Sequence, residues 1–491
     1  MTVINPNSIS GITSITMPSG DGNVLTVHTN DGTERFRIDS SGNVKVGSAA
    51  TISPDGDLFV TGVCTATTLS GAASGLTGAL PAIDGSALTG IAATDNVRTG
   101  ILDVAGIATF RNDVNIGAAV TISESGIEAS GIGITCKNIN GGSIGGRRNM
   151  FINGSCVIGQ RGSTASLQSG YGGVDRYYFY NGGDGRVTFS QDTDVPTGSG
   201  FSHSIKLDVT TADSNGASNR GWFGQRVERD ICQRMKKGTS SATKSTVSFW
   251  IKSPKTGTHI VRIYDNVNDR DVGATYTVSS ANTWEHKVVT FPADTTGAIS
   301  NGTTYGMQVY WLIVSGSNSQ TSALGTTWAT YSGGAEGQGG QNLLDSTDNN
   351  IYFTGLQWEV GDEATEFEHR SVAEETTLCQ RYYFRFTTST SGTNVAMGWQ
   401  MTSSAAKIVL PFPTSMRTRP TAVETTGTAS DYSVSRTSTY EECNTVPTFA
   451  GASKEVGNVN TNQTQASLST GQSVALRANS TSFYLGFSAE L

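Results

Sequence analysis

The chain has 491 residues, which is too long for one ordinary hydrophobic core, so the sequence predicts two to four folding units. Its 59 glycines, abundant Ser and Thr, and 15% charged residues are typical of turn-rich β-structure and argue against an α-rich protein. The net charge of −8 without a basic stripe argues against nucleic-acid binding, and the lack of a long apolar run argues against membrane insertion.

The cysteines and the first residues bear on the compartment. Six cysteines stand far apart without CxxC spacing: Cys64, Cys136, Cys156, Cys232, Cys379 and Cys443. This pattern predicts buried free thiols rather than disulfides or metal ligands. The start, MTVINPNSISG, has neither the positive nor the apolar region of a secretory signal, so we expect synthesis in a reducing cytoplasm.

Residues 1–146 contain only three aromatic residues, too few for a compact core. A short motif recurs there. It consists of Ile, then Asp or Ser, then a turn that contains Gly, and then one or two apolar residues. It reads RIDSSGNVKVG (37–47), TISPDGDLFVTG (51–62) and TISESGIEASG (121–131). Such strand–turn–strand units bury no face alone, so we expect an attachment region and fibre shaft of intertwined identical chains, most simply a homotrimer. A Gly/Ser linker is the alternative, above all for 69–100.

Residues 147–370 predict an antiparallel β-sandwich or jelly roll. The stretch STVSFWIKS (245–253) alternates strictly, with Val247, Phe249 and Ile251 on one face. Further strands are expected at 259–266, 283–294, 304–316 and 351–361. The whole chain is therefore expected to be all-β.

Local signals predict the elements at both ends of this domain. Asn153-Gly154 favours a β-hairpin with a type I′ turn. Ser371, three residues before Glu374, forms a capping-box pattern and predicts a short linking helix within 371–386. The remaining residues, 387–491, predict a C-terminal β head.

Several long motifs resemble tail-fibre and related receptor-binding structural proteins of marine, cyanophage-like bacteriophages. In chain order they include NMFINGSCVIGQRG, GYGGVDRYYFYNGG, FSHSIKLDVTTADS, MKKGTSSATKSTVSFWIKSPKTGTHIVRIYDN, NTWEHKVVTFPADTTG, LQWEVGDEATEFEHR and CQRYYFRF. The resemblance covers about 147–386 and implies a jelly roll similar to a carbohydrate-binding module. It also implies location in a virion, as a tail or capsid appendage made in the host cytoplasm and bound to other virion proteins. Such modules often hold a structural Ca²⁺ ion, for which the sequence assigns no ligands.

No catalytic motif occurs in its required context. GGSIG (141–145) matches the G-x-S-x-G pattern but lies in a Gly-rich joint, without a strand before it or a helix after it. DNVNDRD (265–271) departs from a calcium-binding EF-hand loop at Val267 and Arg270 and predicts a solvated turn. The sequence therefore predicts no catalytic residues, no cofactor and no enzymatic activity.

A glycan-binding surface is predicted instead, because sugars present flat C–H faces to aromatic rings and hydroxyls to polar groups. The candidates lie on strand faces opposite the expected core and in the loop TTWATYSGG. They are Trp250, Arg262, Tyr264, Trp328, Tyr331, Gln357 and Glu359. For each of them, packing against a neighbouring sheet or subunit is the alternative.

The resulting hypothesis is a virion fibre protein that attaches to a host cell through multivalent binding of surface polysaccharide. A tailspike that depolymerises polysaccharide and a purely structural fibre or decoration protein are the alternatives. The sequence leaves open the host, the sugar, tail or capsid mounting, the attached end, and whether the sandwich or the head binds the receptor.

Overall fold

The computed structural model describes residues 24–63, 65, 146–436, 439–464 and 469–491. The chain divides into two compact units, Met1–Thr121 and Ile122–Leu491. The described residues form antiparallel β-sheets with two short α-helices, α1 (Arg229–Cys232) and α2 (Val372–Gln380), which confirms the all-β class. The predicted repeat at 121–131, the stretch 69–100 and the GGSIG motif lie outside the described residues.

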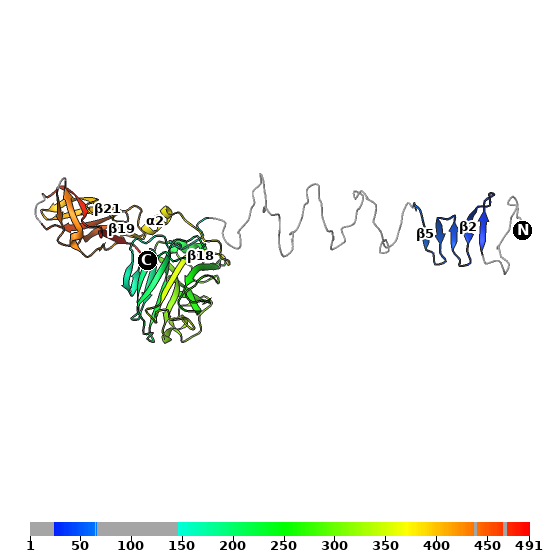
Figure 1. The fold of residues 1–491 in the computed structure, drawn as a ribbon, viewed down its shortest axis with the longest axis horizontal. Helices are drawn as coiled ribbons and strands as arrows, with labels where there is room; N and C mark the ends of the chain where they lie inside the picture. Colours follow the sequence, from blue (N-terminus) through cyan, green and yellow to red (C-terminus); the bar gives the residue numbers. More distant parts are fainter. Residues whose placement is uncertain (1–23, 64, 66–145, 437–438, 465–468) are drawn as a thin grey trace. The chain divides into compact units, whose positions relative to one another are not determined.

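The first unit contains a five-stranded sheet in which each strand pairs with the next one along the chain (Figure 1). The strands are β1 (Leu25–His28), β2 (Glu34–Ile38), β3 (Val44–Val46), β4 (Ala50–Ile52) and β5 (Leu58–Val60). The two described repeats form the hairpins β2–β3 and β4–β5. Gly42 and Gly56 take positive φ in their turns, so the strand–turn–strand reading of these repeats is confirmed.

One face of this sheet is uniformly apolar because the strand register aligns apolar residues across all five strands. The apolar face consists of Leu25, Val27, Phe36, Ile38, Val44, Val46, Ala50, Ile52, Leu58 and Val60. None of these ten side chains is buried; Val46 is 53% exposed and Leu58 57%. Polar residues such as Lys45 and Thr51 lie on the other face. The described chain therefore leaves an apolar sheet face uncovered.

The second unit begins with a two-layered sandwich, as predicted. One sheet has six strands in the order β15 (Trp284–Phe291), β12 (Ser245–Lys252), β18 (Asn350–Val360), β10 (Ser204–Thr211), β9 (Arg186–Asp192) and β6 (Thr164–Leu167). The other has seven in the order β17 (Ala329–Thr330), β14 (Arg270–Val278), β13 (Gly257–Asp265), β16 (Tyr305–Ser315), β11 (Arg220–Glu228), β8 (Tyr177–Asn181) and β7 (Ser169–Tyr171). Both sheets contribute to the core, where the rings of Phe223, Trp311 and Phe353 lie within 6 Å of one another. Val247, Phe249 and Ile251 are fully buried, which confirms the predicted face.

The predicted hairpin at Asn153-Gly154 is wrong. Asn153 takes a positive φ of 64°, as a type I′ turn requires, but no strands flank it. Its side-chain amide donates to the carbonyl oxygens of Ile158 and Asp175, and its backbone N–H donates to Glu375. This fully buried turn packs beside the sandwich and helix α2 because its polar groups are satisfied there rather than in a ladder.

Helix α2 begins where the capping pattern predicts. Ser371 Oγ accepts a hydrogen bond from the Glu374 N–H at 3.3 Å. The Glu374 carboxylate pairs with Arg147 at the start of the sandwich instead of closing the reciprocal half of the capping box. No helix in the described residues has both the length and the apolar character needed to cross a membrane.

The C-terminal residues form two further sheets around a separate core. The three-stranded sheet has the order β19 (Tyr383–Thr387), β28 (Tyr484–Ser488) and β22 (Glu424–Thr425). The seven-stranded sheet has the order β24 (Thr439–Glu442), β23 (Tyr432–Arg436), β27 (Ser473–Ala478), β20 (Asn394–Thr402), β21 (Ala405–Pro411), β26 (Val456–Asn462) and β25 (Thr448–Ala452). Across the described residues the four cysteines are buried free thiols, as predicted.

Buried ion pairs join this C-terminal part to the sandwich. Arg176 pairs with Glu490, lies over the Tyr382 ring at 3.4 Å and donates to the carbonyl oxygen of Arg226 at 2.8 Å. Its side chain is 1% exposed, and that of Glu490 is 4% exposed. Because water does not screen these charges, the geometry of the joint depends on their pairing.

Candidate functional site

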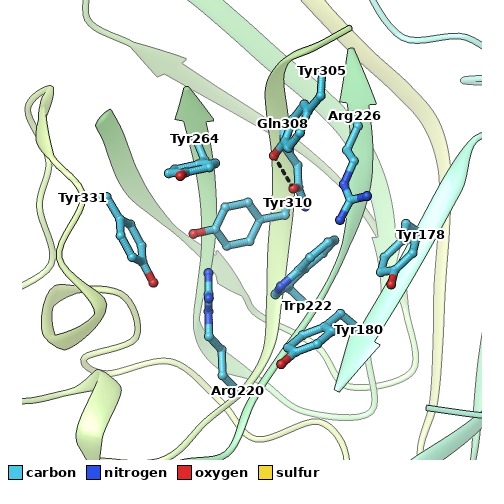
Figure 2. Close-up of a pocket in the computed structure, with 10 residues that line it drawn as sticks. All are labelled: Tyr178, Tyr180, Arg220, Trp222, Arg226, Tyr264, Tyr305, Gln308, Tyr310 and Tyr331. Carbon is cyan, nitrogen blue, oxygen red and sulfur yellow. Dashed lines mark hydrogen bonds between the residues drawn. The ribbon is translucent and has the colours of Figure 1, made fainter. Parts of the chain in front are cut away.

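The outer face of the seven-stranded sheet of the sandwich carries an open groove of about 350 Å³. Side chains alternate across a strand, so β8, β11, β13 and β16 turn one set of residues into the core and the other into this groove. Figure 2 shows the lining residues, which define the aromatic groove: Tyr178, Tyr180, Arg220, Trp222, Arg226, Tyr264, Tyr305, Gln308, Tyr310 and Tyr331.

Trp222 lies among three tyrosines at the centre of the aromatic groove (Figure 2). Its ring stacks with Tyr178 and Tyr180 at centroid distances of 5.4 and 5.6 Å, and Tyr310 lies 5.6 Å away at a tilt. On the same strand Gly224 leaves room beside Tyr310, since a Cβ there would lie 2.2 Å from the carbonyl oxygen of Val309. The result is a continuous aromatic floor.

Tyr264 and Tyr331 form a second pair of rings, 5.5 Å apart and nearly perpendicular. Partial burial raises the pKa of each hydroxyl to about 12, helped at Tyr264 by a hydrogen bond of 3.0 Å to Asp269. Both phenols are therefore neutral at physiological pH; because the Tyr264 hydroxyl donates to Asp269, it is left to accept a hydrogen bond.

A buried carboxylate fixes one side of the aromatic groove. Glu336 is fully buried and accepts from Arg220 at 2.6 Å and from the Tyr310 hydroxyl at 2.9 Å. Burial raises the pKa of Glu336, and the positive charge of Arg220 opposes this shift. Glu336 thus orients Arg220 and Tyr310 while remaining out of reach of a bound molecule.

Arg226 and Gln308 lie directly opposite each other on β11 and β16. The Arg226 guanidinium lies 4.6 Å from the Tyr178 ring centroid and donates to the backbone oxygen of Leu491 at 2.6 Å. Gln308 accepts from the Tyr305 hydroxyl at 2.8 Å, the bond drawn in Figure 2. Its amide nitrogen is buried and has no hydrogen-bond partner in the described structure.

Of the residues proposed from sequence, Tyr264 and Tyr331 line the aromatic groove. Arg262 shares their sheet but is 1% exposed, so the expectation of a surface arginine is wrong. It pairs with Asp271 and donates to the carbonyl oxygens of Ala335 and Glu336, because the segment after β17 covers it.

Gln357 and Glu359 are also buried, so neither can contact a ligand at the surface. Alternation along β18 places them on the outer face of the six-stranded sheet, as expected, but the following segment folds back over them. Glu359 accepts from the Thr365 N–H and hydroxyl, and Gln357 accepts from the Glu368 N–H. Both residues hold this segment in place.

The two proposed tryptophans lie away from the aromatic groove. Trp250 is half-buried on the outer face of the six-stranded sheet, with its ring 5.2 Å from His286. Trp328 packs against the edge of the sandwich core and donates from its indole N–H to the carbonyl oxygen of Pro292 at 2.8 Å. The structure therefore does not bring either residue to Tyr264 and Tyr331.

The sequence did not predict most residues that line the aromatic groove, although these residues alternate with core residues along their strands. Tyr178 and Tyr180 alternate with core residues in RYYFYN, and Arg220, Trp222 and Arg226 recur on one face of RGWFGQR. In both segments buried aromatic residues stand between the groove residues, so the alternation alone does not show which set faces outward.

Within the described ranges, no group of three or more His, Cys, Asp or Glu side chains could hold a metal ion. Residues 265–271, which were compared with a calcium-binding EF-hand loop, span the turn of the β13–β14 hairpin. Asp265 there accepts from the N–H of Val267 and pairs with Lys237. The Asp265 carboxylate therefore stabilises the turn.

Comparison with known proteins identifies structural neighbours only. No protein-family model matches the sequence, and no curated protein matches it. Among solved structures, the enzymatically active domain of bacteriophage CBA120 tailspike protein 4 is 16% identical, covering 43% of this chain and 21% of the tailspike, with a TM-score of 0.24.

Carbohydrate-binding modules are also among the neighbours. A CBM4 structure is 12% identical, covering 42% of this chain and 97% of the module, with a TM-score of 0.23. The family 11 module from Clostridium thermocellum, solved with a β-1,3-1,4-mixed-linked tetrasaccharide, is 10% identical, covering 42% of this chain and 98% of the module, with a TM-score of 0.22.

Proposed function

We propose that this protein is a virion fibre subunit that attaches to a host cell by binding surface glycan in the aromatic groove. The observation that carries this proposal is one open groove in which a row of stacked aromatic rings, half-buried at Tyr178 and Tyr180 and nearly fully buried at Trp222, lies beside hydrogen-bonding groups. Its volume of about 350 Å³ is within the range of small-ligand sites. Trp222 and its neighbouring tyrosines offer flat faces to sugar rings, and Arg220, Arg226 and Gln308 offer donors to their oxygen atoms.

Binding without catalysis is part of the proposal. Glycoside hydrolysis uses two carboxyl groups on either side of the scissile bond, about 5 to 9.5 Å apart. No Asp or Glu is among the residues lining the aromatic groove, and the nearest carboxylate on its Arg220 side, Glu336, is buried and paired. A tailspike-type depolymerase would need its two catalytic carboxyl groups outside the aromatic groove.

The test is a panel of host-type surface polysaccharides titrated with the full-length protein, followed by affinity electrophoresis and a reducing-end assay. Retarded migration without release of reducing ends is the expected result. Release of reducing ends would favour the depolymerase, and migration unaffected by every polysaccharide would favour a purely structural fibre or decoration protein.

The fibre part of the proposal rests on the uncovered apolar face of the N-terminal sheet. Burial of each Val, Leu, Ile or Phe side chain contributes about 1.5 to 3 kcal/mol, and a single layer of short strands gains none of this alone. Further copies of the same chain offer matching faces, so association, most simply as a homotrimer, covers them. Several linked sandwiches would then raise avidity for a repeating polysaccharide.

Replacing Val46 with Glu is expected to dissociate the full-length protein. Val46 lies on the apolar face in the central strand β3, and a buried unpaired carboxylate there would cost several kcal/mol per chain. Thr51→Glu is the matched control, since Thr51 lies on the polar face opposite Lys45. Sedimentation equilibrium measures the outcome; wild-type protein that is monomeric at micromolar concentration, or an unchanged mass for Val46→Glu, would contradict the association.

A further inference from the structure

The aromatic groove is rich in donors and poor in acceptors. None of its ten lining residues is Asp or Glu. Behind Arg220, Glu336 Oε1 pairs with Arg220 and accepts from Tyr310, while Glu336 Oε2 is buried without a hydrogen-bond partner among the described residues; Asp269 at the rim accepts from Tyr264. Neutral sugar hydroxyls both donate and accept, so a site for neutral sugar gains from free acceptor side chains. This groove offers tyrosine hydroxyls as its remaining acceptors.

The donors, in contrast, are partly unused. The Gln308 side chain is 4% exposed, and its amide nitrogen has no hydrogen-bond partner in the described structure. The buried Nε atoms of Arg220 and Arg226 also lack partners there, as do those of Arg176, Arg262 and Arg370 outside the groove, so the Gln308 amide is the unpaired donor that distinguishes this site. Buried polar groups are normally satisfied, so unpaired donors lining an open groove point to a ligand that brings acceptors.

The contacts of Arg226 fix its side chain in a position suited to such a ligand. Its guanidinium lies over the rings of Tyr178 and Tyr305, at 4.6 and 5.3 Å from their centroids, and donates from one terminal nitrogen to the backbone oxygen of Leu491. A guanidinium fixed in this way loses little rotamer freedom on binding and presents a planar fork that fits a carboxylate or sulfate. Gln308, its direct cross-strand partner, places an amide donor beside it.

We propose, building on the proposed function, that the glycan is acidic and that the Arg226–Gln308 pair binds its anionic group. The pair receives the carboxylate or sulfate oxygens while adjacent sugar rings stack on Trp222. Arg220, whose charge is paired with Glu336, supplies a further donor across the aromatic floor. The aromatic groove thereby selects charged polysaccharides over neutral ones with the same backbone.

The test is calorimetric titration of the full-length protein with two matched ligand pairs. Oligogalacturonate is compared with the same oligosaccharide after reduction of its carboxyl groups, and dextran sulfate is compared with dextran. At least one acidic member is expected to bind about tenfold or more tightly than its neutral partner, with affinity falling as NaCl rises. The pair that shows the preference distinguishes a carboxylate from a sulfate.

Arg226→Gln is expected to lower affinity for the acidic ligand about tenfold and to remove most of the preference for the acidic member of the pair over the neutral one. Gln308→Leu, which leaves the contact with Leu491 in place, is a second variant and is expected to weaken acidic binding in the same direction. Arg186→Gln is the control, because Arg186 lies on β9 of the other sheet and donates to backbone oxygens of its own turn.

Three results overturn the inference, and they can be distinguished from one another. Equal affinity within both pairs, with binding lost in Trp222→Ala, would show that the aromatic groove binds glycan without regard to charge, so the proposed function would stand alone. Failure of every ligand, acidic and neutral, would overturn the proposed function together with this inference. An acidic preference that Arg226→Gln and Gln308→Leu both retain would place the anion site elsewhere.

Discussion

Trp222→Ala is expected to weaken glycan binding by about 2 kcal/mol or more, roughly thirtyfold, because central aromatic residues dominate such interfaces. Trp222 stacks with two tyrosines and lies beside a third, so its removal breaks the continuous floor of the aromatic groove. The side chain is 7% exposed in the free protein, so the substitution is also expected to lower the free energy of unfolding, by about 3 kcal/mol.

Affinity electrophoresis against the best polysaccharide measures the binding change, and near-ultraviolet circular dichroism verifies that the variant is folded. Trp399→Ala is the matched control, since Trp399 is 44% exposed on β20 of the C-terminal part. Tyr180→Ala removes one stacking partner with less loss of buried area and should weaken binding as well. Wild-type affinity in a folded Trp222→Ala protein would exclude the aromatic groove as the glycan site.

Arg176→Met is expected to lower the free energy of unfolding by about 3 kcal/mol, the lower end of the usual cost of breaking a buried ion pair, because Glu490 keeps Arg161 as a partner. The substitution leaves the Glu490 carboxylate with Arg161 at 3.5 Å and removes the stacking on Tyr382. It also removes the donor to the Arg226 carbonyl oxygen, which lies on the strand that carries the aromatic groove.

Urea unfolding of the full-length protein measures this change. Arg176→Met combined with Glu490→Gln should recover part of the loss, since no carboxylate is then stranded in the joint. Asp362→Asn is the control, because the Lys244–Asp362 pair is more than half exposed and should contribute less than about 1 kcal/mol. A loss below about 1 kcal/mol in Arg176→Met would show that the joint does not depend on this ion pair.

The sequence predicted the sheets well where alternation and turn residues act together. Strand β12 has the expected bounds within one residue and the expected buried face. The N-terminal repeats gave correct hairpins because each contains its own turn glycine. Asn153-Gly154 has the dipeptide of a hairpin, yet its buried contacts to Glu375, far along the chain, determined a different structure.

The site was harder to predict, because an outward strand face is not necessarily a surface. Gln357, Glu359 and Arg262 all point away from the core, but neighbouring segments cover them and use their polar groups. Tyr264 shares its strand and face with Arg262 but stays partly exposed, and Tyr331 lies in a loop beside it. The residues of the aromatic floor could be predicted only from the order of strands β8, β11 and β16 in the sheet. The sequence patterns of these strands do not contain that order.

The most direct test of glycan binding in the aromatic groove is an experimental structure of the full-length protein with a bound oligosaccharide. We expect a sugar ring stacked near Trp222, with an anionic group beside Arg226 and Gln308. Sugar bound instead on the outer face of the six-stranded sheet near Trp250, or on the C-terminal sheets with the aromatic groove empty, would contradict it.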